Sequence, residues 1–367
     1  MSRTVLVARL DSAGDVLLSG PAVRAIAASA EVELLCGPRG AEAGALLPRV
    51  ARTHVWAAPW IVEPAPPVTP AHVQQLAQLV RRVDPDEAIV LTSFHQSPLP
   101  LALLLRLAGV GRITGASVDY AGSLLDVRLR PGEDFPEEQS EVARALGIAA
   151  AAGYPLPAGD DGRLAVTAPP DTTGLTGRDP YVVVHPGAAV PARMWPAGHH
   201  RATVRLLRDR GLDVVVTGSG TERALTAEVA GGARFDLGSA TDLGGVTGLG
   251  SVTDLGGATD LAGLAGVLAG AAAVVVGNTG AAHLAAAVGT PVVSLFSPVV
   301  SERCWRPYGV PVVVFGRTDA GCAGTRARSC PVPGHPCLSD VTPAAVADAV
   351  VAVARTHATT AAEVVAG

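Results

Sequence analysis

The segment with the clearest capacity for chemistry is an apolar run that ends in a glycine turn and passes into an Ala-rich helix. Val274–Val276 form the end of the run, Gly277-Asn278-Thr279-Gly280 form the turn, and His283 follows on the same helix face as Thr279. Such a unit directs backbone N–H groups and the positive end of a helix dipole at the carboxyl edge of a parallel sheet. It predicts a diphosphate site with His283 behind it, although a plain βα turn with a capping threonine has the same pattern.

Two further loops follow predicted strands in the same half of the chain. His185-Pro186-Gly187-Ala188 ends one strand, and Arg193, downstream of it, supplies a forked cation suited to phosphate. Thr217-Gly218 ends the next strand, and Glu222 after it could accept hydrogen bonds from a ribose or could be a solvated residue at a helix start. Because parallel strands end at one edge of their sheet, the three loops together favour a nucleotide site.

The first half of the chain has one comparable loop. Ser12-Ala13-Gly14-Asp15-Val16 lies where the first predicted strand turns into the first helix. The Asp15 carboxylate could act as a general base on an acceptor hydroxyl, or it could only cap the helix. Arg9, at the end of the strand, could hold an anionic acceptor or only pair with Asp11 or Asp15.

The elements that position these loops alternate between strand and helix patterns. In the first half, strands are predicted at 4–10, 32–36, 87–91 and 112–116, and helices at 15–29, 41–47, 72–83 and 99–108. In the second half, strands are predicted at 181–185, 213–217, 273–276 and 292–296, with helices at 197–210, after the turn at 280, and at 342–356. A Pro-, Gly-, Asp- and Thr-rich stretch from about 154 to 180 predicts an interdomain linker.

This alternation predicts an α/β fold with two Rossmann-like doubly wound domains that face a central cleft. At 367 residues the chain is also too long for one ordinary core. We expect an acceptor-binding domain at 1–170, a nucleotide-sugar-binding domain at 171–345, and a closing helix and tail at 346–367.

One stretch is repetitive. Four hexapeptides that share one frame, of which Val252-Thr253-Asp254-Leu255-Gly256-Gly257 is the third, occupy residues 240–263. Four copies are few for a β-solenoid, so the expectation is a duplication that lengthens a surface loop.

Composition excludes several classes of protein. The net charge is −5 and all 28 basic residues are Arg without any basic run, so no nucleic-acid partner is expected. The first residues lack the apolar region of a signal peptide, and no apolar window is long enough to span a membrane. Five cysteines, an odd number, suit a reducing compartment, and the spacing of Cys322, Cys330 and Cys337 matches no zinc pattern. The expectation is a cytoplasmic protein, either free or at the inner face of the membrane.

In combination, the motifs resemble glycosyltransferase family nine, the ADP-heptose:lipopolysaccharide heptosyltransferases. The matching pieces run in order from about residue 4 to residue 353. They are Gly14-Asp15-Val16, His185-Pro186-Gly187-Ala188, Arg193-Met194-Trp195-Pro196, Thr217-Gly218-Ser219-Gly220-Thr221-Glu222, Gly277-Asn278-Thr279-Gly280 with His283, Trp305-Arg306-Pro307-Tyr308-Gly309, and Cys330-Pro331 to Cys337-Leu338.

The resemblance implies a GT-B fold and an inverting sugar transfer from a nucleotide sugar, in the first place ADP-heptose, with no cofactor and no metal. It implies that Asp15 is the base and that Arg9 and Ser12 lie at the acceptor. The donor nucleotide would be held by Gly187, Ala188, Arg193, Thr217, Gly218, Glu222, Thr259, Asn278, Thr279, Gly280 and His283.

Some positions depart from the family pattern. Ala188 stands where small hydroxyl residues are frequent, Arg193 stands where Lys is usual, and Asn278 stands where Asp is frequent. The repeats cover the segment that carries a Thr-Ser-Leu motif in the family, so either Thr241 or Thr259 could be its counterpart, and Thr259 is preferred.

Three functions remain open on these grounds. The first is an inverting glycosyltransferase, expected to be a monomer, that acts on a glycan, a glycolipid or a secondary metabolite, either free or in peripheral association with a membrane. The second is a sugar-nucleotide 2-epimerase of similar two-domain architecture. The third is a non-catalytic nucleotide-binding module. Incubation with the donor alone separates the first two, since an epimerase changes the sugar without an acceptor.

Overall fold

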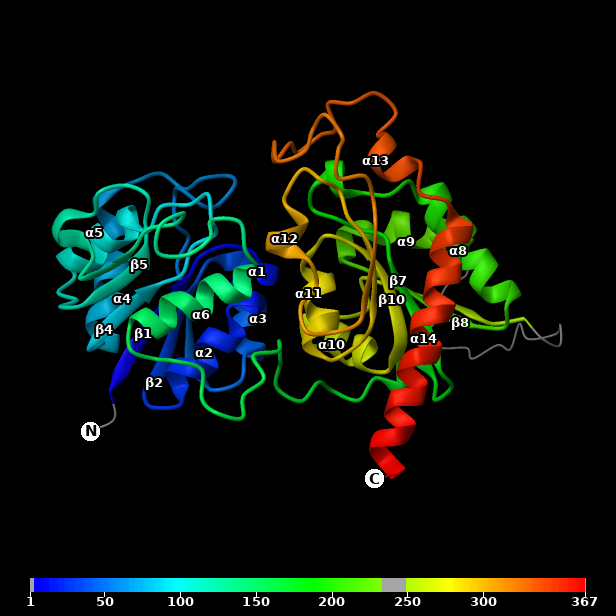
Figure 1. Cartoon of the computed structure of the whole chain (residues 1–367), viewed down its shortest axis with the longest axis horizontal. Helices are drawn as coiled ribbons and strands as arrows, with labels where there is room; N and C mark the ends of the chain where they lie inside the picture. The colour runs from blue at the N-terminus through cyan, green and yellow to red at the C-terminus, as the bar shows by residue number, and fades with distance from the viewer. Residues whose placement is uncertain (1–2, 233–248, 367) are drawn as a thin grey trace. The chain divides into compact units, whose positions relative to one another are not determined.

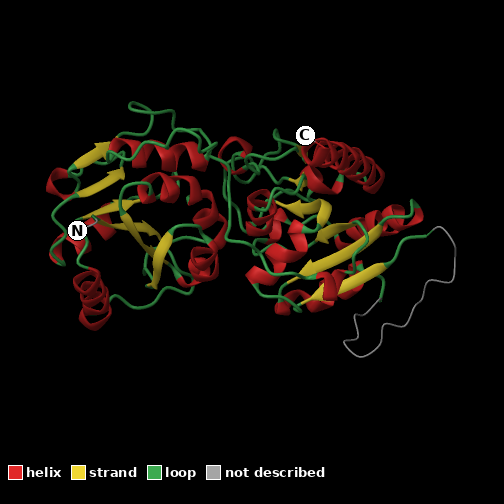
Figure 2. Cartoon of the chain, turned by 90° about the horizontal axis from the view of Figure 1, so that it is seen from below, coloured by secondary structure: helices red, strands yellow, loops and turns green. Residues whose placement is uncertain are grey.

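The computed structural model describes residues 3–232 and 249–366. The chain divides into two compact units, Met1–Thr167 and Ala168–Gly367. Each unit holds a six-stranded, all-parallel sheet with helices packed against it (Figures 1 and 2). The predicted α/β class with two doubly wound sheets is confirmed.

The first sheet has the strand order β3-β2-β1-β4-β5-β6. Its strands are β1 (Thr4–Arg9), β2 (Glu31–Cys36), β3 (Val50–Val55), β4 (Glu87–Val90), β5 (Ile113–Ala116) and β6 (Val127–Leu129). Its helices are α1 (Ala13–Leu18), α2 (Gly20–Ala27), α3 (Ala41–Leu46), α4 (Pro70–Val83), α5 (Leu99–Leu107) and α6 (Glu141–Ala151).

The second sheet has the strand order β12-β11-β10-β7-β8-β9. Its strands are β7 (Tyr181–His185), β8 (Asp213–Gly218), β9 (Val252–Gly256), β10 (Ala271–Gly277), β11 (Val292–Leu295) and β12 (Val312–Phe315). Its helices are α7 (Thr173–Thr176), α8 (Ala197–Asp209), α9 (Arg223–Val229), α10 (Leu261–Ala269), α11 (Gly280–Ala287), α12 (Glu302–Trp305), α13 (Pro336–Ser339) and α14 (Pro343–Ala366).

Both sheets have the same topology, because each is built outward from its first strand and then reverses. The reversal lies between β1 and β4 in the first unit and between β7 and β10 in the second. At such a switch point the connections leave in opposite directions, so a crevice opens at the carboxyl ends of the two strands. Predicted functional residues lie at or after the ends of β1, β7 and β10, three of these four strands, and others lie at the end of β8 and after β9.

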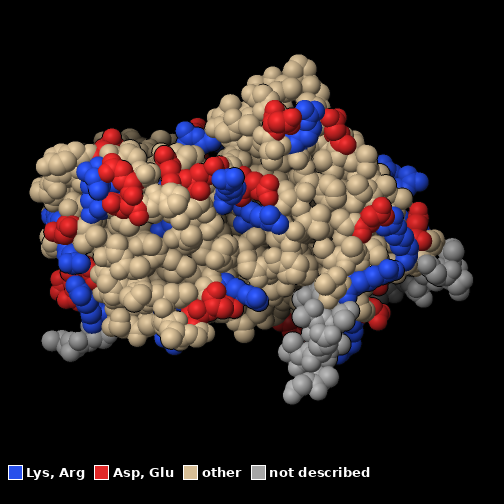
Figure 3. All heavy atoms as spheres, viewed as in Figure 1, with Lys and Arg blue, Asp and Glu red and all other residues tan. Residues whose placement is uncertain are grey.

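Burial explains why the central strands form. Strands covered on both faces are continuous apolar runs, and β1, β7 and β10 are almost entirely buried. In the second unit, α14 contributes Val346, Val350 and Val353 to the same core as the sheet residues. On the face drawn in Figure 3, acidic and basic side chains lie next to one another.

The structure corrects one predicted helix. The single helix expected at 15–29 is two helices, α1 and α2, which meet at Ser19. Pro21 lies in the first turn of α2, and since it has no N–H it could not continue the hydrogen bonds of α1. The strands β3, β6, β9 and β12 and the helices α6 and α9 were not predicted.

The expectation of a surface loop for the repeats is wrong where the structure describes them. The third repeat forms β9, which pairs with β8 at the edge of the second sheet, and Leu255 is fully buried. Asp260 of the fourth repeat caps α10 by accepting a hydrogen bond from the Gly263 N–H at 2.7 Å. The third copy begins with two β-branched residues, Val252 and Thr253, which suit a strand. Thr241 lies outside the described residues.

Candidate functional site

At the switch point of the first sheet, a buried arginine gathers three carboxylates. Arg9 is the last residue of β1, and its Nη2 lies 3.1 Å from Asp11 Oδ2 and 3.2 Å from Asp15 Oδ1. The same nitrogen lies 3.1 Å from Oε2 of Glu141, the first residue of α6, and donates to the Ser93 hydroxyl at 2.7 Å. We call Arg9, Asp11, Asp15 and Glu141 the Arg9 cluster.

Asp15 both caps a helix and presents a carboxylate. Its Oδ2 accepts hydrogen bonds from the Ser12 N–H at 3.3 Å and from the Ser12 hydroxyl at 2.7 Å, in the first turn of α1. The Asp15 side chain is 17% exposed, against 7% for Asp11 and 1% for Glu141. The capping interpretation is therefore correct, and Asp15 is also the most accessible acid of the cluster.

Burial governs the ionisation of the other two acids. Burial raises the pKa of Asp11; the positive charge of Arg9 opposes this shift, and the negative charge of Asp15 adds to it. It also raises the pKa of Glu141, again opposed by Arg9 and reinforced by Asp15. Burial by itself lowers the pKa of Arg9, but the three carboxylates outweigh it, so that this pKa is raised and the guanidinium stays charged.

The structure corrects the expectation that Arg9 contacts an acceptor. Arg9 is 1% exposed and its charge is shared by three acids, so its role is to hold this loop. Glu141 was not predicted, because it follows the polar stretch 131–140 and lies 132 residues from Arg9. The cue would have been Ser140, whose hydroxyl caps α6 by accepting from the Ala143 N–H.

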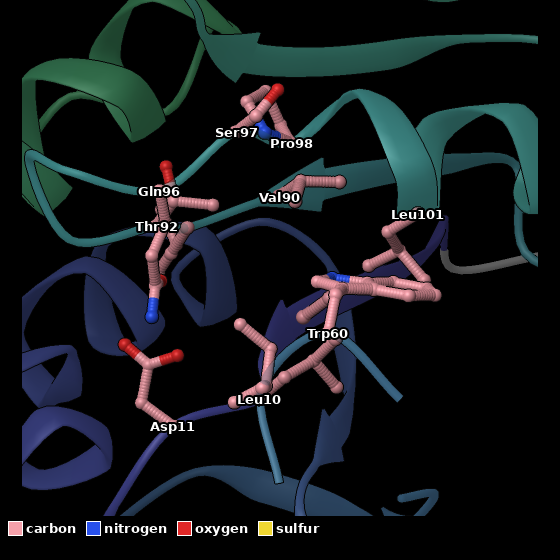
Figure 4. A pocket seen from close by; sticks show the side chains of 12 residues that line it. Leu10, Asp11, Trp60, Val90, Thr92, Gln96, Ser97, Pro98 and Leu101 are labelled. Carbon is pink, nitrogen blue, oxygen red and sulfur yellow. The ribbon is translucent and has the colours of Figure 1, made fainter. Parts of the chain in front are cut away.

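A narrow pocket adjoins the cluster at the ends of β1 and β4 (Figure 4). We call it the Trp60 pocket. Figure 4 shows the amide of Gln96 directed at Asp11 on one side and the Trp60 ring on the other. The lining residues are Ala8, Leu10, Asp11, Trp60, Ile61, Val90, Leu91, Thr92, Gln96, Ser97, Pro98 and Leu101. Asp11 is the one ionisable side chain among them, so the pocket suits an uncharged group.

The switch point of the second sheet brings three predicted loops together. Register places His185 of β7 beside Val276 of β10, and Gly277 beside Leu295 of β11. The His185 Nδ1 lies 3.0 Å from Thr217 Oγ1, at the end of β8. Burial lowers the pKa of His185, which favours a neutral imidazole, while the Glu222 charge opposes that shift.

Gly187 gives space to a carboxylate. A Cβ on Gly187 would lie 2.0 Å from Glu222 Oε1, so Glu222 lies directly against the glycine backbone. The Glu222 Oε2 accepts from the N–H and the hydroxyl of Ser219, each at 2.8 Å. The prediction assigned Gly187 to close phosphate approach; the contact in the structure is with Glu222. Ala188, half-buried, follows it, and Gly218 packs against Thr226 of α9.

Asn278 holds the turn after β10 in place. Its Nδ2 donates to the Ser297 carbonyl at 3.4 Å, and its Oδ1 accepts from the Ser297 N–H at 3.3 Å. Arg193, half-buried, donates from Nη1 to the Asn278 carbonyl at 3.4 Å, and its own carbonyl lies close to Gly277. The Asn278 side chain thus positions the turn through backbone contacts, and the sequence held no sign of Ser297 as its partner.

The start of α11 offers polar groups at the same edge. Thr279 and Gly280 are half-buried where the helix begins, and His283 is buried one turn further on. In the described part of the chain, the buried Thr279 Oγ1 has no hydrogen-bond partner. Thr259 lies just before the cap of α10, a helix that packs against α11. The N–H groups and dipole of α11 with Arg193 beside them can hold an anion.

The cysteines form no disulfide. All five are thiols, and Cys322 and Cys337 are buried. Across residues 3–232 and 249–366, no group of three or more His, Cys, Asp and Glu is arranged to hold a metal ion. Over the same ranges, every helix is too short or too polar to cross a bilayer.

Comparison with known proteins gives a match to one family model and to one relative in that family. Residues 73–335 match the model of glycosyltransferase family 9 (heptosyltransferase). The lipopolysaccharide heptosyltransferase 1 of Pseudomonas aeruginosa is 30% identical over 265 residues, which are 70% of this chain and 66% of that enzyme, just under two thirds of its length.

Solved structures share the fold over nearly the whole chain. Escherichia coli ADP-heptose lps heptosyltransferase II is 22% identical, with a TM-score of 0.70, over 96% of this chain and 99% of that one. The family 9 glycosyl transferase of Veillonella parvula is 16% identical with a TM-score of 0.71, over 97% and 99% of the two chains. E. coli heptosyltransferase WaaC with ADP is 20% identical with a TM-score of 0.66, over 95% and 99%. On the family match, which spans most of the sequence, this chain belongs to glycosyltransferase family 9.

Proposed function

We propose that the protein is an inverting glycosyltransferase that transfers heptose from ADP-heptose to a hydroxyl of an uncharged acceptor. The observation that carries the proposal is Asp15, a partly accessible carboxylate held at the switch point of the first sheet. Membership of family 9 supports the reaction class.

The donor is assigned from the second unit and from a relative. WaaC of E. coli has been solved with ADP and with ADP-2-deoxy-2-fluoro heptose, and this chain shares its fold. In our proposal the first turn of α11 and Arg193 hold the diphosphate, with His283 behind them. Glu222, already fixed by Ser219, accepts hydrogen bonds from the ribose hydroxyls.

The reaction requires a base and a stabilised leaving group. Asp15 takes the proton of the acceptor hydroxyl while the hydroxyl oxygen forms a bond to the anomeric carbon. The bond from that carbon to the diphosphate oxygen breaks at the opposite side, so the configuration inverts and ADP leaves. The helix dipole of α11 and the charge of Arg193 stabilise the negative charge that develops on ADP. Asp15 then releases its proton to solvent. No metal ion is needed in this scheme.

The acceptor is a glycan, a glycolipid or a secondary metabolite. The residues around the Trp60 pocket support an acceptor without charge near this end of the sheet, because they are apolar or neutral apart from Asp11, which Arg9 already pairs. An aromatic face such as Trp60 also packs well on the apolar face of a sugar ring.

The test measures ADP release from ADP-heptose with and without uncharged acceptors, and determines the anomeric configuration of the product by NMR. Acceptor-dependent ADP release with inversion supports the proposal. Conversion of the donor sugar without any acceptor would indicate an epimerase. ADP binding by calorimetry without turnover on a broad acceptor panel would indicate a binding module.

A further inference from the structure

The Trp60 pocket has room for one small group. Its interior volume is about 10 Å³, which is about the space that a single water molecule requires. A sugar ring is too large to enter, whereas one hydroxyl group has the size of a water molecule. A ligand of this pocket therefore inserts one hydroxyl and lies with its other atoms across the mouth.

The polar wall of the pocket is a network at the ends of β1 and β4. The Ser93 hydroxyl donates to Asp11 Oδ2 at 3.1 Å, and the Ser93 N–H donates to Gln96 Oε1 at 3.3 Å. The amide of Gln96 is directed at Asp11 and hydrogen-bonds to it (Figure 4). An amide nitrogen has two hydrogens and a carboxylate has several lone pairs, so both groups keep capacity for a ligand. A hydroxyl, which donates and accepts, matches a carboxylate beside an amide.

The other side of the mouth is the indole ring of Trp60. Its side chain is part of a residue that is 37% exposed, and its ring centroid lies 5.6 Å from that of Trp56, which is 4% exposed. The turn that carries Trp60 is closed by the Ile61 N–H, which donates to the Ala58 carbonyl at 3.0 Å. Trp60 is thus an accessible aromatic face that is supported from behind, so it loses little freedom when a ligand packs on it.

The polar wall is also linked to the proposed base. The Nη2 atom of Arg9 lies 3.1 Å from Asp11 Oδ2 and 3.2 Å from Asp15 Oδ1. A single nitrogen therefore lies between the carboxylate of the pocket and the carboxylate that takes the proton in our scheme. A molecule with one hydroxyl in the pocket can present a second hydroxyl to Asp15. An alcohol with only one hydroxyl cannot occupy both places.

We propose that the Trp60 pocket is the recognition subsite for an uncharged sugar residue of the acceptor, with Trp60 packed on the sugar ring and Gln96 and Asp11 bound to one of its hydroxyls. The inference rests on the proposed function and narrows the acceptor to a neutral carbohydrate. An anionic sugar is disfavoured, because its carboxylate would be repelled by Asp11. Trp60 and Gln96 are then specificity-determining residues, and Asp15 remains the base.

The first experiment measures sugar binding without any donor, so that it does not depend on turnover. The probes are the methyl glycosides of glucose, galactose and mannose, together with methyl glucuronide and methyl galacturonide, which carry a carboxylate on the same rings. Saturation-transfer NMR at pH 7 reports the affinity of each probe. At least one neutral glycoside should bind, and its acidic counterpart should bind at least about 10-fold more weakly. Equal affinity for the two, or no binding of any neutral glycoside, would overturn the proposal.

Variants of the pocket locate that binding. Trp60→Ala should lower the affinity for the bound glycoside about 5–10-fold, and Trp60→Phe should lower it less, because an aromatic face remains. Gln96→Met keeps the length of the side chain but removes the amide, and should lower the affinity about 2–10-fold. Leu103→Ala is the control, since Leu103 is an exposed apolar residue of α5 outside the pocket lining, and it should bind like the wild type. Melting temperatures establish that each variant is folded. Unchanged affinity in Trp60→Ala and Trp60→Phe would show that the sugar binds elsewhere.

Turnover of ADP-heptose supplies the second readout. With a neutral sugar acceptor, Trp60→Phe and Gln96→Met should raise the KM for the acceptor and leave kcat near that of the wild type. A wild type that binds neutral glycosides but releases no ADP with any acceptor refutes the proposed function and leaves the subsite standing. A wild type that transfers heptose with a KM for the acceptor that neither variant changes refutes the subsite and leaves the proposed function standing.

Discussion

Two hydrogen bonds join the amide side chain of Asn278 to the backbone of Ser297. The Asn278 Nδ2 donates to the Ser297 carbonyl, and its Oδ1 accepts from the Ser297 N–H. Asn278 follows β10 and Ser297 follows β11, so the pair fixes the turn that starts α11 against the neighbouring strand end. A carboxylate at position 278 could accept from Ser297 but could not donate to it.

Asn278→Asp should therefore destabilise the second unit. The substitution leaves a buried carbonyl without a donor and adds a buried charge, which costs about 1–3 kcal/mol in the free energy of unfolding. Chemical denaturation at pH 7 measures this cost, and calorimetry measures the accompanying loss of ADP affinity. Unchanged stability would mean that the amide pair contributes nothing to the turn.

Asp15→Asn should separate catalysis from folding. The amide keeps an acceptor for the Ser12 N–H but cannot take a proton, so turnover should fall about 10²–10⁴-fold while ADP affinity and the melting temperature stay near those of the wild type. Ser12→Ala is the companion variant, since it removes a partner of Asp15 and keeps the carboxylate. It should lower the melting temperature more and turnover less. The reverse order would reduce Asp15 to a helix cap.

Arg193→Ala should weaken ADP binding by about 1.5–3 kcal/mol through the loss of a charge-assisted phosphate bond. Arg193→Lys should recover part of that loss, because the charge returns without the fork. Arg201→Ala, which removes an exposed arginine from α8, is the control and should leave the affinity unchanged. Equal ADP affinity in Arg193→Ala and wild type would remove Arg193 from the site.

The Arg24–Asp160 pair should make stability sensitive to acid. The hydrogen bond from Arg24 lowers the pKa of Asp160 to about 2, and the two side chains meet at 2.7 and 2.8 Å. Because the folded pKa is depressed, the pair stabilises the fold above the ordinary Asp pKa and the contribution is lost as pH falls from about 4 to about 2. Asp160→Asn should cost about 1–2 kcal/mol at pH 7. The melting temperatures of the two proteins should converge as pH falls to about 2, and a constant difference over this range would contradict this account.

Leu255 and Leu249 occupy the same position of two successive repeats and should respond differently to truncation. Leu255 is fully buried in β9, and Leu249 is 40% exposed. Leu255→Ala should cost about 2–5 kcal/mol in the free energy of unfolding, and Leu249→Ala less than about 0.5 kcal/mol. Denaturant titration of the two variants checks the contrast. Equal losses would show that both copies belong to the core.

Local patterns were sufficient for the fold class and for the loops that carry the candidate site. Apolar β-branched runs that end in Gly-rich turns, and Ala-rich or amphipathic segments between them, are signals contained within a few residues. They indicated β1, β7, β8 and β10, and with them the loops at Asp15, Gly187 and Asn278. The same signals predicted that these loops meet at the carboxyl edges of parallel sheets.

Tertiary structure decided which side chains meet there. Glu141 reaches Arg9 across 132 residues, and Asn278 pairs with Ser297 across 19, because strand order and helix packing bring these segments together. The repeats show the same limit: Leu249 and Leu255 share one position of the repeat, but Leu255 is buried because its copy pairs with β8, while Leu249 is exposed. Burial then shifted the acid–base balance of the Arg9 cluster. Periodicity specifies local conformation, whereas contacts, burial and charge depend on what packs alongside.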